Sequence, residues 1–336
     1  MRAARLAHAL ESGQLVLPAE GAVGVFRPDG ADDLSALPAG RVRVFTGNAL
    51  AHRAFSAQGL PVARAPAAPL AAAIVCLPRA RDHGRALVAE AIASVGHGGL
   101  LVVDGQKQDG IETMQRDLGR AGITIEAVVA KAHGRLLTLR APASAPDGWA
   151  ADWREVEPGV FTRPGVFSAD GPDPGSALLA ANLPEGLAGR VADLGAGWGW
   201  LALQALRHPA ITQLDLIEAE ADALDCARRN IADPRARFVW ADALRHRPDA
   251  LFDAVLCNPP FHAGRPAEPA LGQAFIRAAA AMLKPRGTLW LVGNRHLPYE
   301  ETLRSSFVTV AEVGSSPGFR VWSAQGKRTS RTHGMG

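Results

Sequence analysis

The chain alternates short apolar segments with helix-forming segments, and it does so twice in the same order. In the second half the order is FDAVLC, a helical run over 274–283, KPRG, TLWLVGN, the helix-like YEETLRSSF, and then VTVAEVG and FRVWSAQ joined by SSPG. In the first half it is AAIVCLPRARDH, a helical run over 84–94, GHGG, LLVVDG, IETMQRDLGRAG, and then ITIEAVVA and RLLTLRA joined by KAHG. This self-similarity favours an internal duplication. The alternative is that any two α/β domains share such an order.

Alternation of strands and helices predicts the α/β fold class, with two tandem Rossmann-like domains whose sheets are mostly parallel. The short turn before the last segment of each half predicts that the last strand runs antiparallel to its neighbour. Domains that bind nicotinamide dinucleotides are usually parallel to the edge of the sheet. An antiparallel last strand is instead typical of S-adenosylmethionine-dependent methyltransferases of the Rossmann-like class.

One segment between the two halves has the composition of a linker. Residues 141–160 are rich in Ala, Pro, Gly and acidic side chains, as connecting segments commonly are. We therefore expect a first domain over 1–145, a linker over 146–165 and a second domain over 166–336.

The composition excludes several classes of protein. The 336 residues suffice for two domains, and the hydrophobic content of 48% is typical of globular proteins. The three cysteines, Cys76, Cys226 and Cys257, form no C-x-x-C pair, so we expect no metal site and a reducing, cytoplasmic location. We expect neither a signal peptide nor a membrane span. The net charge of +3 is compatible with a nucleic-acid partner but is weak evidence for one.

A glycine-rich turn, RVADLGAGWGW over 190–200, follows a short strand and precedes a helical segment. Gly195, Gly197 and Gly199 would let the backbone take positive φ and approach a ligand closely. A tight turn from strand to helix needs glycine in any case, so the spacing alone is a weak signal. Within the turn we expect Trp200 to pack in the core, and Trp198 either to pack or to form a wall of a pocket.

Three acidic residues follow or end three successive predicted strands. Asp193 stands at the end of the strand before the glycines, the strand in QLDLIEAE ends on Glu218, 25 residues after Asp193, and the strand in ARFVWADAL ends on Asp242. Glu218 would accept hydrogen bonds from both hydroxyls of an adenosine ribose, Asp242 one from the adenine amine, and Asp193 suits a cationic ammonium better than a pyrophosphate. Each acid alone is typical of a solvated loop, but the set favours a cationic adenosyl ligand over NAD.

The stretch CNPPFH over 257–262 ends another predicted core strand. Prolines donate no hydrogen bond, so this strand end offers only acceptors. The side-chain oxygen of Asn258 and the carbonyl of Pro259 would accept the two hydrogens of a planar amine, and Phe261 would stack on the base that carries it. The alternative is a proline-rich turn with Phe261 in the core.

Together these segments resemble a known family. DLGAGWG, NPPFHAG, TRPGVFSADGPDPGSALL, NRHLPYEETL and GFRVWSA are similar to the bacterial ribosomal RNA small subunit methyltransferase C family, which methylates guanine N2 and has an inactive methyltransferase-like first domain. The resemblance implies S-adenosylmethionine as cofactor and catalysis by Asn258, Pro259, Pro260 and Phe261. It implies a cofactor site formed by Phe167, Ser168, Asp193, Gly195, Ala196, Gly197, Gly199, Glu218, Ala219, Asp242, Ala243 and Asn258.

The first half departs from this pattern. Its nearest phrase to the glycine turn, RVRVFTGNAL, lacks the glycines and the acid, and in place of CNPPFH it has CLPRAR, with Leu77 at the position of the amide and Ala80 at that of the aromatic residue. We expect this degenerate copy to bind no cofactor. A cationic edge, formed by Arg79, Arg81, His83 and Arg85, suits RNA phosphates; structural support of the second domain is an equal alternative.

The leading hypothesis is therefore an S-adenosylmethionine-dependent enzyme that methylates the N2 amine of a guanine in small-subunit (16S) ribosomal RNA. Its partner would be ribosomal RNA, within the small subunit, without metal or membrane. The oligomeric state is open, with a monomer slightly favoured. The alternatives are methylation of adenine N6 or of a protein glutamine, and a non-catalytic ribosome assembly factor with the same fold.

Overall fold

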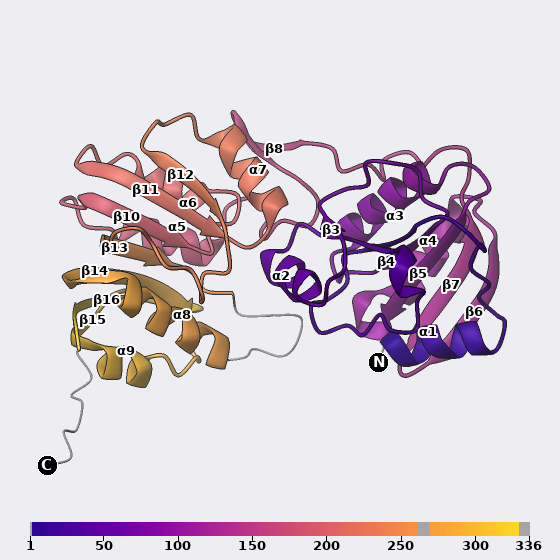
Figure 1. Cartoon of the computed structure of the whole chain (residues 1–336). Helices are drawn as coiled ribbons and strands as arrows, with labels where there is room; N and C mark the ends of the chain where they lie inside the picture. Colours follow the sequence, from indigo (N-terminus) through magenta and orange to yellow (C-terminus); the bar gives the residue numbers. More distant parts are fainter. Residues whose placement is uncertain (1, 261–268, 329–336) are drawn as a thin grey trace, which may run out of the picture. The chain divides into compact units, whose positions relative to one another are not determined.

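A computed structural model describes residues 2–260 and 269–328 of the chain, which divides into two compact units (Figure 1). The first unit is Met1–Trp153 with Arg163–Gly165, and the second is Arg154–Thr162 with Val166–Gly336. The segment expected to link the domains contributes to both units. Trp149 is buried in a core cluster of the first unit, whereas β8 and β9 form an antiparallel hairpin that belongs to the second.

The first unit contains one seven-stranded sheet in the order β3-β2-β1-β4-β5-β7-β6. All neighbouring strands are parallel except that β7 is antiparallel to both β5 and β6. Its strands are β1 Val23–Phe26, β2 Val42–Phe45, β3 Val62–Ala63, β4 Ala72–Cys76, β5 Leu100–Gln106, β6 Ile125–Lys131 and β7 Gly134–Arg140. Its helices are α1 Arg2–Glu11, α2 Ala49–Ala57, α3 Arg81–Val95 and α4 Ile111–Arg120, with the 3₁₀ helices η1 Ala39–Arg41 and η2 Lys107–Asp109.

The second unit repeats this architecture, with the strand order β12-β11-β10-β13-β14-β16-β15 and an antiparallel β16. The predicted fold class, two tandem Rossmann-like α/β domains with an antiparallel last strand, is confirmed. The strands of this unit are β8 Arg154–Glu157, β9 Val160–Thr162, β10 Gly189–Leu194, β11 Ile211–Glu218, β12 Ala236–Trp240, β13 Phe252–Cys257, β14 Leu283–Asn294, β15 Phe307–Ser315 and β16 Phe319–Lys327. Its helices are α5 Pro174–Ala181, α6 Trp200–Ala205, α7 Ala221–Asn230, α8 Pro269–Met282 and α9 Glu300–Ser306.

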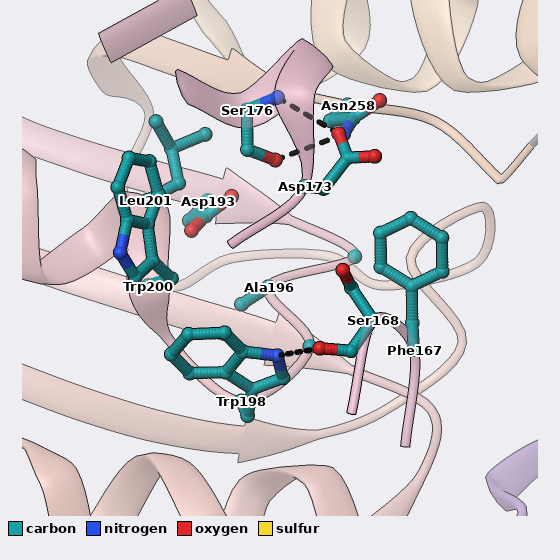
Figure 2. A pocket seen from close by; sticks show the side chains of 12 residues that line it. Phe167, Ser168, Asp173, Ser176, Asp193, Ala196, Trp198, Trp200, Leu201 and Asn258 are labelled. Carbon is teal, nitrogen blue, oxygen red and sulfur yellow. Dashed lines mark hydrogen bonds between the residues drawn. The ribbon is translucent and has the colours of Figure 1, made fainter. Parts of the chain in front are cut away.

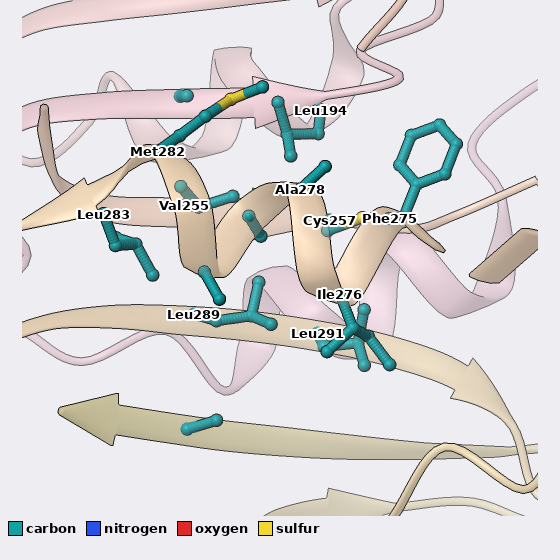
Figure 3. Close-up of a cluster of buried hydrophobic side chains, with 14 of the residues drawn as sticks. Leu194, Val255, Cys257, Phe275, Ile276, Ala278, Met282, Leu283, Leu289 and Leu291 are labelled. Atoms are coloured by element: carbon teal, nitrogen blue, oxygen red, sulfur yellow. The ribbon is translucent and has the colours of Figure 1, made fainter. Parts of the chain in front are cut away.

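The central strand β13 is apolar on both faces because helices cover the sheet on both sides. Val255 and Cys257 pack with α8 and α9. Figure 3 shows the apolar side chains of α8 against those of β13 and the neighbouring β14. Ala254 and Leu256 point to the other face, where they pack with residues of α5, α6 and α7. This packing fixes the end of β13, from which Asn258 follows.

Two sequence comparisons are corrected by the topology. The segment KPRG, which the sequence analysis placed before the strand TLWLVGN, lies within β14, where the pairing with β13 shifts register between Phe252 and Ala254. The phrase RVRVFTGNAL contains β2, which occupies the sheet position of β11. Its comparison with the glycine turn is therefore wrong: the counterpart of β10 is β1, and the segment to compare begins at Arg27.

That segment shows how the first unit differs from the second. After β1 the backbone turns at Arg27 with φ of 52°, and residues 27–38 contain no helix where β10 is followed by the glycine turn and α6. Leu77, which follows β4 as Asn258 follows β13, is 5% exposed and packs in the core. A methyl group added at Gly84 would lie only 2.7 Å from Leu77 Cδ1.

No helix within residues 2–260 and 269–328 combines the length and the apolar character needed to cross a membrane.

Candidate functional site

The carboxyl ends of four neighbouring strands bring the predicted polar residues to one edge of the second sheet. β12, β11, β10 and β13 lie side by side and run parallel. Asp193 is the last residue but one of β10, Glu218 ends β11, and Asp242 and Asn258 follow β12 and β13. In an open α/β sheet this edge is where ligands bind.

A pocket lies at this edge, shown in Figure 2. It is lined by Phe167, Ser168, Asp173, Ser176, Asp193, Gly195, Ala196, Gly197, Trp198, Trp200, Leu201 and Asn258. Seven of these were predicted from the sequence as site residues: Phe167, Ser168, Asp193, Gly195, Ala196, Gly197 and Asn258. The other predicted residues in the described part of the chain do not line this pocket: Gly199, Glu218, Ala219, Asp242, Ala243, Pro259 and Pro260. Phe261 lies outside the described residues.

The three glycines of the turn have different tasks. All have positive φ: 74° at Gly195, 55° at Gly197 and 85° at Gly199. A methyl group added at Gly197 would meet no atom within 4 Å, so this position is open. At Gly199 it would lie 2.9 Å from Ile231 Cδ1 and 3.0 Å from Ala227 Cβ. Gly199 therefore allows α6 to begin close against α7, whereas Gly195 and Gly197 line the pocket.

Asp193 is a buried carboxyl that lines the pocket, with 2% of its surface exposed. Burial, followed by repulsion from Glu218, raises the pKa of Asp193 to about 7, and a backbone hydrogen bond from Ala202 opposes the rise. Its Oδ2 atom accepts no hydrogen bond from any residue that the structure describes. A buried carboxylate without a counter-ion is costly, and a cationic group in the pocket would supply one.

Glu218 and Asp242 support the glycine turn from the neighbouring strands. Glu218 Oε2 accepts a hydrogen bond of 2.8 Å from the N–H of Gly197, and Oε1 accepts one of 2.9 Å from Glu220. Burial raises the pKa of Glu218. The Glu218 carbonyl accepts from the N–H of Ala241, which holds the segment that carries the buried Asp242. The predicted acidic residues thus lie along one edge, with Glu218 bonded directly to the turn.

The side-chain amide of Asn258 is held by two residues at the start of α5, Asp173 and Ser176. Its Nδ2 donates to Asp173 Oδ2 at 2.8 Å and to Ser176 Oγ at 2.9 Å. Its Oδ1 is buried and has no hydrogen-bond partner among the described residues. Pro259 is buried and Pro260 is exposed. The Oδ1 atom of Asn258 is therefore available to accept a hydrogen bond from a ligand, which is the role predicted for it from the sequence.

Phe167 and Ser168 form one side of the pocket, and Trp198 holds them there. The Trp198 indole is 3% exposed, and its Nε1 donates to the Ser168 carbonyl at 3.2 Å. Ser168 has φ of 53°, which is unfavourable for a residue with a Cβ. The neighbouring Phe167 is 57% exposed, which is unusual for a large apolar side chain. Trp198 is thus both packed and a wall of the pocket.

Several residues that line or support the pocket were not predicted from the sequence. Asp173 and Ser176 were quoted only as part of a longer segment, and their signal was the Asp-Pro pair at a helix start. Trp200, expected in the core, lines the pocket and donates to Glu157 at 3.2 Å. Asn230 had no sequence signal: it exchanges hydrogen bonds with Phe161 of β9 and donates to the Trp198 carbonyl.

These residues fit an adenosyl ligand that carries a positive charge. The buried Asp193 Oδ2 lacks a partner in the described chain. The Gly197 backbone is open to close approach by a ligand, and its N–H donates to Glu218. An anionic pyrophosphate would instead meet the carboxyl of Asp193. Among the residues that the structure describes, no cluster of His, Cys, Asp and Glu is arranged to hold a metal ion.

The corresponding edge of the first unit has a different character. Arg81 and Arg85 both donate to the buried carboxyl of Asp117, at 2.9 and 3.2 Å from their Nε atoms. His83 is 8% exposed. Of the cationic edge predicted from the sequence, two arginines thus share one acidic partner and the histidine is buried. The exposed Arg79 lines a pocket with Arg81.

The chain is similar to several known methyltransferases. Residues 157–323 match the family described as "Methyltransferase small domain". The ribosomal RNA large subunit methyltransferase G of Shewanella amazonensis is 36% identical over 59% of this chain, but the match spans only 57% of that relative's length. The small subunit methyltransferase C of the same organism is 30% identical over 74% of this chain and 76% of its own length.

A solved structure resembles the whole chain. It is a 16S rRNA guanine-N2 methyltransferase of T. thermophilus in complex with AdoMet and guanosine, with a TM-score of 0.78 and 26% sequence identity. The match covers 96% of this chain and 92% of that one. It therefore extends over both units, including the first, which lacks the glycine turn.

Proposed function

The chain belongs to the ribosomal RNA small subunit methyltransferase C family, and from this premise we propose that it transfers a methyl group from S-adenosylmethionine to the N2 amine of a guanine in 16S ribosomal RNA. The observation that carries the proposal is the side chain of Asn258. Its nitrogen is fully engaged, while its buried oxygen has no partner in the described chain. An amine is the donor that this acceptor lacks.

The chemistry of the acceptor explains why such a site suffices. The lone pair of an amine attached to a purine ring is delocalised, so the nitrogen is a poor nucleophile. S-adenosylmethionine supplies a methyl group that is already activated by a positively charged sulfur. The protein therefore contributes placement and fixed dipoles more than a strong base.

Asn258 and Pro259 supply that placement. The Asn258 oxygen and the Pro259 carbonyl accept the two amine hydrogens, so that the lone pair points out of the plane of the base toward the pocket. As charge develops on the nitrogen, these two oxygens stabilise it without reorganising. Phe261 stacks on the base, which must leave its helical stack to reach the pocket.

The cofactor is held by the opposite part of the site. Asp193 pairs with the cationic ammonium of S-adenosylmethionine, Glu218 accepts from the ribose hydroxyls and Asp242 from the adenine amine. Gly195, Ala196, Gly197 and Gly199, together with Ala219 and Ala243, supply backbone that lies close to the ligand. Phe167 and Ser168 cover it. The solved relative from T. thermophilus supports this assignment because it binds AdoMet and guanosine.

The partner is ribosomal RNA within the small subunit, and we place the enzyme in the cytoplasm, where subunits are assembled. The three cysteines are buried and form no disulfide within the part of the chain that the structure describes, which agrees with a reducing compartment. The first unit binds RNA or supports the second unit, and it takes no part in the chemistry.

Large-subunit RNA is a second candidate acceptor, favoured by the 36% identity to the large subunit methyltransferase G. One experiment separates the candidates. Small and large ribosomal subunits from a strain that lacks the protein are incubated with it and with methyl-labelled S-adenosylmethionine, and each RNA is digested to nucleosides. We expect label in N2-methylguanosine from 16S RNA only.

Asn258→Ala should reduce this label to a small residual rate, while the control Asn294→Ala, which changes an exposed residue that does not line the pocket, should retain it. Label in N6-methyladenosine or in protein would overturn the proposal. Label confined to the large subunit would favour the second acceptor, and cofactor binding without any label would favour an assembly factor.

A further inference from the structure

Both hydrogens of the Asn258 amide are used by one short segment far away in the sequence. Asp173, 85 residues earlier, accepts one at 2.8 Å, and Ser176, 82 residues earlier, accepts the other at 2.9 Å. Figure 2 shows the three side chains together at one side of the pocket. An amide nitrogen has two donors, so this pair saturates it.

The pair also decides which way the amide faces. A half-turn of the Asn258 side chain would place its oxygen against the Asp173 carboxyl and the Ser176 hydroxyl oxygen, and would remove the charge-assisted hydrogen bond to Asp173. The observed orientation is therefore strongly preferred. It leaves Oδ1 buried and without a partner in the described chain, which is the arrangement of an acceptor prepared for a ligand.

Asp173 and Ser176, which together form a clamp on the Asn258 amide, are themselves held by the start of a helix. Asp173 is the N-cap of α5, and its Oδ2 also accepts from the backbone N–H of Ser176 at 2.9 Å. Pro174 begins the helix, and Leu179 anchors it in the core with no exposed surface. One carboxyl oxygen thus joins the helix start to the catalytic amide, on a scaffold that packs against the sheet.

We propose that Asp173 and Ser176 are positioning residues that fix the amide of Asn258 with its oxygen available to the target amine. The assignment of the amine rests on the function proposed above. Asp173 makes no contact with the base in this role and acts only through Asn258. The competing explanation is that Asp173 merely caps α5.

Two substitutions of Asp173 separate these roles. Serine and asparagine are both good N-caps, so Asp173→Ser and Asp173→Asn should both preserve α5. Asparagine keeps an oxygen at the same reach and can accept from Asn258, whereas serine is too short to do so. If the residue only caps the helix, both variants behave alike; if it positions Asn258, only the asparagine variant stays active.

The expected result is a loss of kcat. Asp173→Ser should lower kcat by about 10- to 100-fold, as expected for a displaced catalytic group, with the affinity for S-adenosylmethionine and the melting temperature close to those of the wild type. Asp173→Asn should remain within a few-fold, and Ser176→Ala should lower kcat about tenfold. In the Asn258→Ala background neither Asp173→Ser nor Ser176→Ala should lower kcat further.

Equal activity of the serine and asparagine variants of Asp173, or losses that add to that of Asn258→Ala, would overturn the proposal. A second measurement does not depend on the RNA substrate. The side-chain amide protons of Asn258 should exchange slowly in the NMR spectrum of the wild type and of Asp173→Asn, and rapidly in Asp173→Ser. If the wild type methylates no guanine but shows this pattern, the proposed function fails and the clamp stands; rapid exchange in the wild type overturns the clamp itself.

Discussion

The carboxyls of Asp193 and Glu218 lie at the ends of neighbouring strands, and repulsion between them adds to burial in raising the pKa of Asp193 to about 7. Asp193 is thus a group whose charge changes near neutral pH. Under the proposed function it must be ionised when it pairs with the ammonium of S-adenosylmethionine. Ligand binding and proton release are then linked at this residue.

The first prediction is a pH dependence of cofactor affinity. Below pH 7 the pocket must lose a proton before it can pair with a cation, so affinity should fall by up to about tenfold per pH unit between about pH 7 and pH 5. Isothermal titration calorimetry in buffers of different ionisation enthalpy measures both the affinity and the proton released. Asp193→Asn should bind weakly with a flat profile over this range; a slope that persists in this variant would assign the proton to another group.

The second prediction concerns stability in the absence of ligand. Because the pKa of Asp193 is raised on folding, the native state holds its proton where the unfolded state has lost it, and stability falls as pH rises from about 4 to about 7. Above pH 7 Asp193→Asn should therefore be more stable than the wild type, on the order of 2–4 kcal/mol, and the gain should vanish toward pH 4. Thermal unfolding across this range measures it.

Asp215 provides the matched control for that measurement. It is an equally buried carboxyl of β11, but it accepts from Gln213 and lies within 4 Å of Arg190 and Arg237. Asp215→Asn should therefore lower the melting temperature at neutral pH. A destabilised Asp193→Asn would show that the Oδ2 atom of Asp193 has a partner in the native protein.

A third prediction distinguishes Asp193 from Glu218 by the part of the ligand that each carboxyl binds. Adenosine has the ribose of S-adenosylmethionine but no ammonium. Glu218→Gln, which also perturbs the bond to Gly197, should weaken both ligands about tenfold, as the loss of a hydrogen bond to a charged group does. Asp193→Asn should weaken S-adenosylmethionine alone. Competition binding with the two ligands tests this, and a loss of adenosine affinity in Asp193→Asn would contradict the assignment.

The fourth prediction uses the different surroundings of two glycines. Gly199→Ala forces a methyl group against Ile231 and Ala227 at positive φ, so it should lower the melting temperature markedly. Gly197→Ala meets no atom and should cost only the strain of the left-handed backbone, about 1–2 kcal/mol. Its methyl group instead takes space near the ligand and should reduce cofactor affinity. If both variants lost stability equally and bound equally, the turn would not divide its tasks in this way.

The fold was predictable because its signals are local and repeated. Apolar segments alternating with helices predict the parallel sheets, and the SSPG turn predicts the antiparallel β15 and β16, which the structure confirms. The glycine turn, Asp193 and Asn258 could be found because they lie at or directly after strand ends, and parallel strands end at one edge. The wrong comparison of RVRVFTGNAL arose because β1 is followed by no helix, which removed the signal that marks a first strand.

The partners of the site residues could not be predicted, since they depend on contacts between distant segments. Nothing in the sequence connects Asp173 with Asn258, because their contact exists only when α5 packs beside the end of β13. Asn230 likewise joins β9 to the glycine turn through the end of α7. The pKa of Asp193 depends on burial, which the pattern of one strand does not quantify.

The packing around Leu77 opposes the appearance of the NPPF asparagine in the first unit. The Leu77 side chain fills the space between Gly84 and Gly105, whose added methyl groups would lie 2.7 and 3.1 Å from it. Replacing it with asparagine would remove buried apolar contacts and place an amide where apolar side chains surround it, at a cost of several kcal/mol. The single change that introduces the motif residue would thus destabilise the unit before it gained any activity. Because packing opposes this substitution, the two halves can diverge further but cannot readily exchange tasks.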